Sequence, residues 1–460
     1  MKLLILLALS WKFSFSMNSF EFCNFCNPGE LYLNCDSDEC DSEQIHTIKD
    51  ESVICGDEEV LRENITTLSI RRCIFNEFNL FKNCTLLKLH YIEDMHSMQK
   101  ETLSEMNQLT NIELMYTDPE DLTWLASAIS GLANLRSVHC YGYNLTKMSA
   151  SSFQGVHHLK KLLIAEYTNP TLSSLPPGLF RDLNQLETLI LHLGHLSNFS
   201  AIDFTGLEKL TSLNINMKQI SFIPTKMYIP KSLRYLVLQD NGIRDIASTS
   251  FSQMPNLIRL EMSLNQIERL PANAFIELTD LRVLNLWDNS IDRIENGAFT
   301  NLKNLKKLDL RNNKLTALDE YTFRGLRNLK YLSLRGNSIS TISVNAFSGL
   351  PNLVQLILRK QDGLETIDLN AFPQFVDLQT KTVIYTAIST EPDDFEKKEM
   401  ERLEDPNYME LFGSFYIGKP DHQVDLHNLT KSMADQSLIL GNLDLSINRI
   451  TSINVEKSLV

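Results

Sequence analysis

Three arginines recur at a fixed spacing and could together form one anion-binding surface. Arg311, Arg335 and Arg359 follow one another at intervals of 24 residues. A guanidinium group presents a planar fork of N–H donors that matches the oxygens of a carboxylate or a sulfate. If 24 residues make one structural repeat, the three side chains lie side by side on neighbouring strands, about 5 Å apart. The spacing therefore predicts a ladder of cations on one face.

Aromatic and lysine side chains accompany the arginines in the same repeats. The ligand-binding set that we infer comprises Trp287, Lys307, Arg311, Lys330, Tyr331, Arg335, Arg359 and Lys360, with Arg282 and Lys306 beside it. The functional interpretation is an anionic patch flanked by aromatic anchors. The alternative is a solvated face, because like charges opposite one another repel, and Asp288 and Asp309 could neutralise part of the strip. Both interpretations stay open from the sequence.

The elements that must position these residues are short strands in a repeated frame. The frame Leu-x-x-Leu-x-Leu-x-x-Asn recurs with asparagines at Asn241, Asn265, Asn289, Asn313 and Asn337, and phenylalanine follows the same period at Phe251, Phe275, Phe299, Phe323 and Phe347. In each strand alternate side chains point inward and outward, so the leucines form a core and the intervening residues an open face. The asparagines are expected to hydrogen-bond backbone at the turns, and the phenylalanines to fill the opposite side.

This pattern resembles the extracellular leucine-rich repeat family in its 24-residue type, which includes Toll-type ectodomains, slit-like, chaoptin-like and acid-labile-subunit-like proteins. The frame is most regular from Leu233 to Phe372, is looser upstream to Leu68, and returns once at Leu443. The resemblance implies an α/β repeat solenoid: a curved horseshoe with a parallel concave sheet, few helices and a Cys-rich N-terminal cap. It also implies recognition of proteins or polyanions on the faces of the solenoid.

The predicted organisation begins with an export signal. Lys2, an apolar stretch from Leu3 to Trp11, and the small residues Ser14 and Ser16 are typical of a cleaved signal peptide. We expect a signal peptide over residues 1–16, the cap over 17–64, repeats over 65–379, an acidic insert or loop over 380–436, and a final, incomplete repeat over 437–460. Because that repeat has no cysteine cap, we expect a fragment or splice form of a longer protein; the alternative is another chain covering the end.

Cysteines and glycosylation sequons agree with export. The disulfide candidates are Cys23, Cys26, Cys35, Cys40, Cys55, Cys73 and Cys84, whereas Cys140 occupies an inward repeat position and is expected to be a core thiol. Zinc at Cys23 and Cys26 is a minor alternative, because no second ligand pair completes the site. The candidate glycan acceptors are Asn64, Asn83, Asn144, Asn198 and Asn428. None lies between Ala201 and His427, so the cationic repeats are expected to be free of N-glycans.

Charge and motif content restrict the function. A formal charge of −14 argues against nucleic acid as the main partner, and no stretch after the signal is apolar enough for a membrane span. No catalytic motif occurs, and His157, His158, His192 and His195 have no carboxylates at a shared frame position, so we expect no enzyme, cofactor or metal. We expect a secreted or extracellular chain, at the cell surface if a longer form exists, that binds a protein or polyanion as a receptor or adhesion ectodomain. The alternatives are a freestanding secreted matrix or carrier protein and, for assembly, a homodimer.

Overall fold

In a computed structural model the chain forms two compact units, Met1–Tyr143 and Asn144–Val460. The structure describes residues 82–90, 105–115, 123–142, 148–166, 174–194, 199–218 and 228–358 continuously, with shorter pieces between residues 30 and 454. The division at residue 143 falls inside the array that the sequence predicted as one run of repeats. The predicted signal peptide and almost all of the acidic insert lie outside the described residues, so those boundaries stay predictions.

The first unit is built from parallel strands that are neighbours in sequence. Its sheet has the order β1 (Glu30–Asn34), β4 (Thr67–Arg71), β5 (Leu86–His90), β6 (Asn111–Met115) and β7 (Ser137–Tyr141). An antiparallel hairpin pairs β2 (Ser52–Cys55) with β3 (Glu58–Leu61), and α1 (Thr123–Ile129) precedes β7. No helix among the described residues has the length and apolar character needed to cross a membrane. The expected scarcity of helices is confirmed for this unit.

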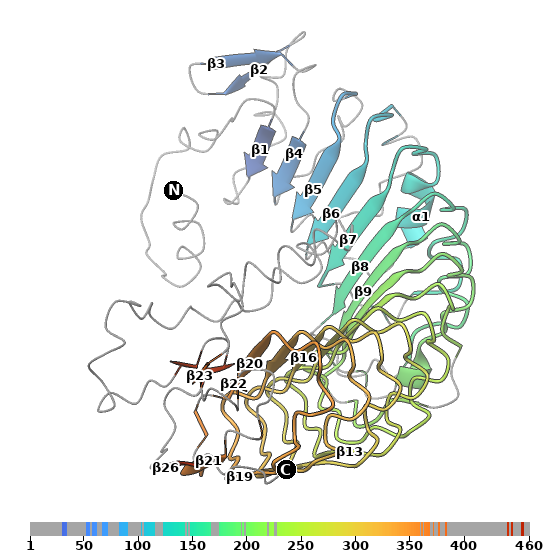
Figure 1. The fold of residues 1–460 in the computed structure, drawn as a ribbon. Helices are drawn as coiled ribbons and strands as arrows, with labels where there is room; N and C mark the ends of the chain where they lie inside the picture. Colours follow the sequence, from blue (N-terminus) through green and yellow to red (C-terminus); the bar gives the residue numbers. More distant parts are fainter. Residues whose placement is uncertain are drawn as a thin grey trace, which may run out of the picture. The chain divides into compact units, whose positions relative to one another are not determined.

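The second unit repeats the same design with greater regularity (Figure 1). Its parallel sheet runs through β8 (Lys161–Glu166), β9 (Thr188–Leu193), β10 (Ser212–Asn216), β11 (Tyr235–Val237), β12 (Arg259–Glu261), β14 (Val283–Asn285), β16 (Lys307–Asp309), β18 (Tyr331–Ser333) and β20 (Gln355–Ile357). Short strands pair on the other side of the coils, β13 (Arg269–Leu270) with β15 (Arg293–Ile294) and β17 (Ala317–Leu318) with β19 (Thr341–Ile342). The parallel-strand solenoid predicted from the repeat is therefore confirmed.

The isolated repeat near the carboxyl end continues this sheet. Strand β25 (Leu443–Asp444) pairs in parallel with β20, so that Leu443 lies opposite Leu356. Strand β26 (Ser452–Asn454) likewise pairs with β21 (Thr366–Asp368), β24 (Ile439–Leu440) pairs antiparallel with β25, and β22 (Val376–Asp377) with β23 (Thr382–Val383). Two coils that are distant in sequence are thus adjacent in space, and the predicted acidic insert separates them only along the chain.

The core is a stack of repeated aliphatic and aromatic side chains. Leu284, Leu308 and Leu332 are fully buried and lie opposite one another in successive strands. On the loop side the rings of Phe275 and Phe299 stack with centroids 6.2 Å apart, and the same stacking continues from Phe251 to Phe347. The predicted leucine core and phenylalanine column are confirmed. Each coil covers the apolar face of the next, which no single coil could bury alone.

The frame asparagines form a buried hydrogen-bonded ladder. Asn313 Nδ2 donates to the carbonyls of Leu286, Leu310 and Arg311 at 3.0, 3.0 and 3.1 Å. Its Oδ1 accepts from the backbone N–H of Ile291 at 3.0 Å, so one side chain satisfies backbone groups of two coils. Gln361 takes the same position two coils later, where Oε1 accepts from Ile339 N and Nε2 donates to Leu334 O. The sequence predicted this role for the asparagines but not for Gln361.

A second ladder, which the sequence analysis missed, holds the turns before the strands. The residue preceding the first leucine of several coils is asparagine, and its Nδ2 donates to a carbonyl of the previous coil. Asn304 bonds Thr279 O at 3.0 Å, Asn328 bonds Lys303 O at 2.8 Å, and Asn352 bonds Arg327 O at 2.8 Å. These side chains are exposed, so each bond links neighbouring coils at the surface.

We expect replacement of an asparagine by alanine to lower the unfolding free energy by different amounts in the two ladders. Asn313→Ala removes three hydrogen bonds to carbonyls and leaves the buried N–H of Ile291 without its acceptor, and we expect a loss of about 3 kcal/mol in unfolding free energy. Asn304→Ala frees a carbonyl that water can reach, and we expect a loss of about 1 kcal/mol or less. Urea denaturation of the purified chain measures both values. Equal losses would contradict a buried ladder that stabilises the fold more than the exposed one.

Candidate ligand-binding face

The candidate site is the sheet face of the coils from β11 to β20, which we call the concave face. Each coil contributes three residues to it, because alternate strand residues point away from the core. The first row consists of Tyr235, Arg259, Val283, Lys307, Tyr331 and Gln355. The second row consists of Val237, Glu261, Asn285, Asp309, Ser333 and Ile357. The third row follows the strands directly and consists of Gln239, Ser263, Trp287, Arg311 and Arg335. The face is therefore a grid of polar, aromatic and charged side chains.

The structure places two of the three predicted arginines on adjacent coils. The backbone N–H of Asp288 donates to Arg311 O at 2.9 Å, and that of Asn312 donates to Arg335 O at 2.8 Å. Trp287, Arg311 and Arg335 thus occupy equivalent positions in successive coils, and all three side chains are half-buried. Arg359, the third predicted arginine, lies outside the described residues.

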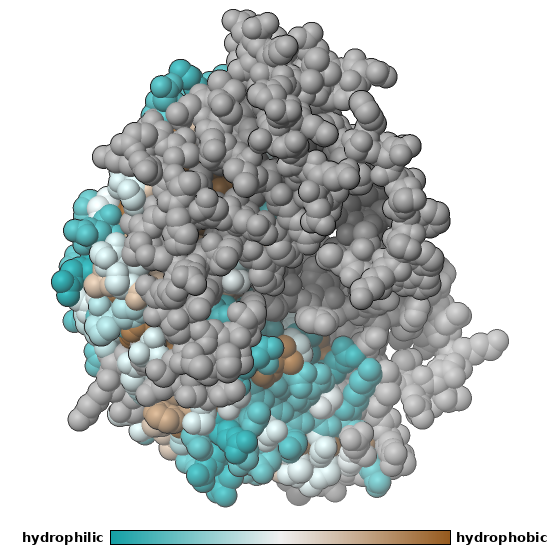
Figure 2. All heavy atoms as spheres, turned by 180° about the vertical axis from the view of Figure 1, so that it is seen from behind, coloured by the Kyte–Doolittle hydropathy of each residue, from teal (hydrophilic) through white to brown (hydrophobic). Residues whose placement is uncertain are grey.

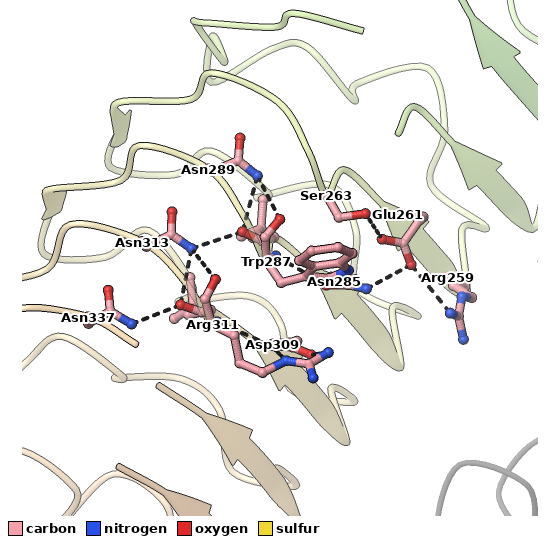
Figure 3. Close-up of polar contacts among 12 residues, drawn as sticks. Arg259, Glu261, Ser263, Asn285, Trp287, Asn289, Asp309, Arg311, Asn313 and Asn337 are labelled. Carbon is pink, nitrogen blue, oxygen red and sulfur yellow. Dashed lines mark hydrogen bonds and ion pairs between the residues drawn. The ribbon is translucent and has the colours of Figure 1, made fainter. Parts of the chain in front are cut away.

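Arg311 has an internal counter-ion (Figure 3). Its Nη2 lies 2.6 Å from Asp309 Oδ2, and its Nε donates to Asp309 Oδ1 at 2.9 Å. The guanidinium carbon also lies 5.9 Å from the centre of the Trp287 ring, within range of a cation–π contact. Asp309 is 1% exposed. Neutralisation by Asp309, which the sequence left as the alternative interpretation, is therefore found for this arginine, and Arg311 is part of a fixed Trp–Arg–Asp cluster.

A second charged cluster lies on the same face, two coils earlier. Glu261 accepts hydrogen bonds from Arg259 Nη2 at 3.3 Å, Ser263 Oγ at 2.8 Å and Asn285 Nδ2 at 3.0 Å. Asn285 Oδ1 in turn accepts from the backbone N–H of Trp287, which connects the two clusters. Burial raises the pKa of Glu261, while Arg259 and the hydrogen bonds from Ser263 and Asn285 oppose that shift. The floor of the face is thus a connected polar network that holds its side chains in place.

The remaining predicted ligand-binding residues differ in accessibility. Tyr331 is only 6% exposed, and Lys307 Nζ lies 5.1 Å from its ring centre. Lys330 is half-buried and belongs to the edge of the sheet, one residue before β18. Lys360 is half-buried with a φ of 59°, the left-handed conformation that Asp288 and Asn312 adopt at the same position of their coils. The backbone of Lys360 therefore follows the turn geometry of the repeat.

The structure describes some of the predicted cysteines and glycosylation sequons. Cys140 is a buried free thiol, as expected, and burial raises its pKa to about 12. Cys84, predicted to form a disulfide, is also free and buried; it lies two residues before β5, and its Sγ donates to Leu86 O at 3.1 Å. Asn83 is exposed, as a glycan acceptor requires. The other four sequon asparagines lie outside the described residues, as do Cys23, Cys26, Cys35, Cys40 and Cys73, while Cys55 ends β2.

Sequence reasoning missed the cluster of Arg259, Glu261 and Asn285. The predicted ligand-binding set was centred on the row that contains Arg311 and Arg335, which has no carboxylate, and it did not include Glu261 in the neighbouring row. Reading all three outward positions in every coil would have found an Arg-x-Glu and an Asp-x-Arg on the same face. Residues two apart in a strand share a face, so each of these pairs is a candidate ion pair. Among the described residues, no group of three or more metal-ligating side chains is present.

The Asp309–Arg311 pair yields a prediction about stability. Arg311→Gln removes the counter-ion of a buried carboxylate, and we expect a loss of about 2 kcal/mol, less than for a fully buried pair because Arg311 is 38% exposed. Adding Asp309→Asn should restore most of that loss. Lys314→Gln, at an exposed position of the same coil, serves as the control. Chemical denaturation that shows no coupling between the two substitutions would contradict the pair.

His192 on β9 yields a prediction about pH. Burial lowers its pKa from 6.5 to about 4, so the folded chain keeps the ring neutral where the unfolded chain accepts a proton. Stability should therefore fall as the pH drops from 6.5 towards 4, by up to about 1.4 kcal/mol per pH unit from this residue. His192→Gln should flatten this part of the stability profile, because it removes the titrating ring. Thermal unfolding measured across that pH range tests the difference.

Comparison with known proteins finds the repeat over most of the chain. A family model described as "Leucine rich repeat" matches residues 231–286, 279–338 and 304–362, and one described as "BspA type Leucine rich repeat region (6 copies)" matches residues 63–160 and 125–233. Osteomodulin of Rattus norvegicus is 27% identical over 38% of this chain and 40% of its own length. Keratocan of Gallus gallus is 32% identical over 21% of this chain and 27% of its own length. The chain spans less than half the length of these relatives.

Similar solved structures include two from complexes. The mouse RP105/MD-1 complex matches with a TM-score of 0.47 and 19% identity, over 70% of this chain and 58% of that chain. The Drosophila Toll–Spatzle complex matches with a TM-score of 0.44 and 18% identity, over 75% of this chain and 48% of that chain. The leucine-rich repeat matches in sequence run without a break from residue 63 to residue 362, and the strands of both units follow the same frame. This chain belongs to the leucine-rich repeat proteins.

Proposed function

We propose that this chain is a non-catalytic extracellular binding protein, acting as a receptor or adhesion ectodomain whose concave face recognises a protein ligand. The observation that carries the proposal is the Trp287–Arg311–Asp309 cluster, with Arg335 in the equivalent position of the next coil. Tryptophan and arginine are the residues that most often dominate the energy of protein interfaces. Here the guanidinium is held by Asp309 and lies within cation–π range of the ring, so little side-chain freedom is lost on binding.

The polar floor of the face favours a protein over a simple polyanion. Arg259 and Arg311 each have a carboxylate partner two residues away on the same face. Cations paired in this way contribute less net positive potential than the arginine ladder implied by the sequence. A surface of hydrogen-bonding groups of both signs around an aromatic anchor is typical of protein interfaces. This is why we assign a protein, rather than a polyanion, to the concave face.

The extracellular and non-catalytic parts of the proposal draw support from the relatives. Osteomodulin and keratocan are extracellular leucine-rich repeat proteins. The expected export signal, sequons and early cysteines of this chain point to the same compartment. A freestanding secreted matrix or carrier protein that sequesters a ligand is the alternative function. Full-length protein recovered from the medium of expressing cells would favour that alternative, and retention on the cell surface would favour the receptor or adhesion ectodomain.

Paired substitutions test the concave face. We expect Trp287→Ala with Arg335→Glu to weaken capture of the protein partner by about 100-fold, because two anchor side chains are lost at once. Arg311 is left unchanged so that Asp309 keeps its counter-ion. The control variant, Tyr321→Ala with Arg293→Glu, likewise removes one aromatic side chain and reverses one arginine, at exposed positions away from this face.

The measurement is quantitative capture from extracellular fluid, followed by affinity determination for each captured protein. Proteins retained by the wild-type chain and by the control, but not by the concave-face variant, would support the proposal. Equal retention by all three chains would place the binding surface elsewhere.

A further inference from the structure

A separate row of cations lies at the edge where the strands begin. We call it the basic rim and define it by Arg282, Lys303, Lys306, Arg327 and Lys330. The backbone N–H of Lys306 donates to Arg282 O at 2.8 Å, and that of Lys330 donates to Lys306 O at 2.9 Å. These three residues are therefore direct neighbours on successive coils. Strand spacing sets the distance between coils at about 5 Å, so positive charge repeats along the solenoid at that interval.

The rim is accessible and carries little opposing charge. Arg282, Lys303 and Arg327 are exposed, while Lys306 and Lys330 are half-buried. The rim positions of these three coils are residues 279–282, 303–306 and 327–330. Among them Asp280 is the single acidic residue, and five residues are cations. Arg282, Lys303, Arg327 and Lys330 take part in no ion pair with any residue that the structure describes. The contrast with the concave face is clear, because there Arg259 and Arg311 have carboxylate partners on their own strands.

The exposed asparagine ladder holds the rim in position. Asn328 Nδ2 bonds the carbonyl of Lys303, and Asn352 Nδ2 bonds the carbonyl of Arg327. Two of the cations thus project from turns that are tied to the next coil. Like charges side by side repel, and the hydrogen bonds to the backbone keep these turns in place despite that repulsion. Such an arrangement presents repeated positive charge to an external anion without a rearrangement of the backbone.

The shape of the rim favours a linear polymer of anions. The cations form a band one or two residues wide per coil, continued after one uncharged coil by Lys231 and Arg234, which are also exposed. No aromatic residue occupies these rim positions, and Val354 ends the row. The described surface at the foot of Figure 2 is mostly hydrophilic, with apolar residues in isolated spots. A globular protein or a bilayer would need apolar anchors, whereas a sulfated chain needs only repeated positive charge.

We infer that the basic rim binds sulfated polysaccharide, independently of the protein ligand proposed for the concave face. Lysine ammonium groups and arginine forks contact successive sulfates along the polymer, with its axis running across the coils. The interaction is electrostatic and weakens as salt rises, because the sulfated chain takes back its counter-ions. One chain can therefore carry two ligands of different chemistry on two adjoining surfaces of the same coils.

Immobilised heparin is the probe for the test. The rim variant is Arg282→Ser, Lys303→Ser and Lys330→Ser, and we expect it to bind heparin about tenfold more weakly than the wild type and to elute at lower salt. The control is Arg269→Ser, Arg293→Ser and Lys314→Ser, which removes three exposed cations from the opposite side of the coils and should elute as the wild type does. Both variants lower the net charge equally. If the rim variant unfolds at a lower temperature, Lys303→Ser with Arg327→Ser, both exposed, replaces it.

Several outcomes would overturn the inference. One is an equal decrease in the eluting salt concentration for the rim variant and the control, which would show that only net charge matters. Others are failure of the wild type to bind heparin and equal binding of desulfated heparin. Binding to phosphatidylserine vesicles without binding to heparin would assign the rim to lipid headgroups instead. The Trp287→Ala, Arg335→Glu variant should keep its affinity for heparin, so a failure of the concave-face proposal is distinguishable from a failure of this one.

Discussion

Hydrogen bonding of buried turns is the constraint on which the structure depends. Each coil has only a three-residue strand in its regular part, and the irregular backbone that follows has buried carbonyl and N–H groups that need partners. An asparagine at a fixed position bonds carbonyls of its own coil and of the previous one, as Asn313 does. A residue in the left-handed conformation precedes it, as Asp288 and Asn312 show at Asn289 and Asn313. Because this solution is local, it can be repeated at every coil and stacks the leucines in register.

This repetition also organises the surface. Every coil places a given frame position at the same point of its strand or turn. Residues at the same frame position in successive coils therefore become neighbours, whatever their chemistry. On the concave face that rule places Trp287, Arg311 and Arg335 in one row, and Glu261, Asn285 and Asp309 in the row beside it. At the edge it places five cations together. The two surfaces differ because residues two apart on the strand face can pair, whereas the rim has one or two cations per coil with no carboxylate between them.

The repeat pattern is interrupted along the sequence, but the parallel sheet continues across the interruption. Leu443 pairs with Leu356 although the chain between them is far longer than one repeat. A parallel strand needs only the correct edge and a matching apolar face, and neither depends on how much chain separates the partners. The sequence shows a final repeat at Leu443, but only the spatial pairing shows which coil it covers.

The sequence by itself determined the repeat, the inward leucines, the phenylalanine column and the buried asparagine ladder. These features depend only on the regular spacing of residues along the chain. It also determined that Arg311 and Arg335 occupy equivalent positions. The tertiary structure decided that Arg311 is paired with Asp309, that Tyr331 is buried, and that Cys84 is a free core thiol. It decided as well that Gln361 can replace asparagine and that Asn328 ties down the basic rim. These outcomes depend on distances between side chains of different coils, which spacing along the chain does not contain.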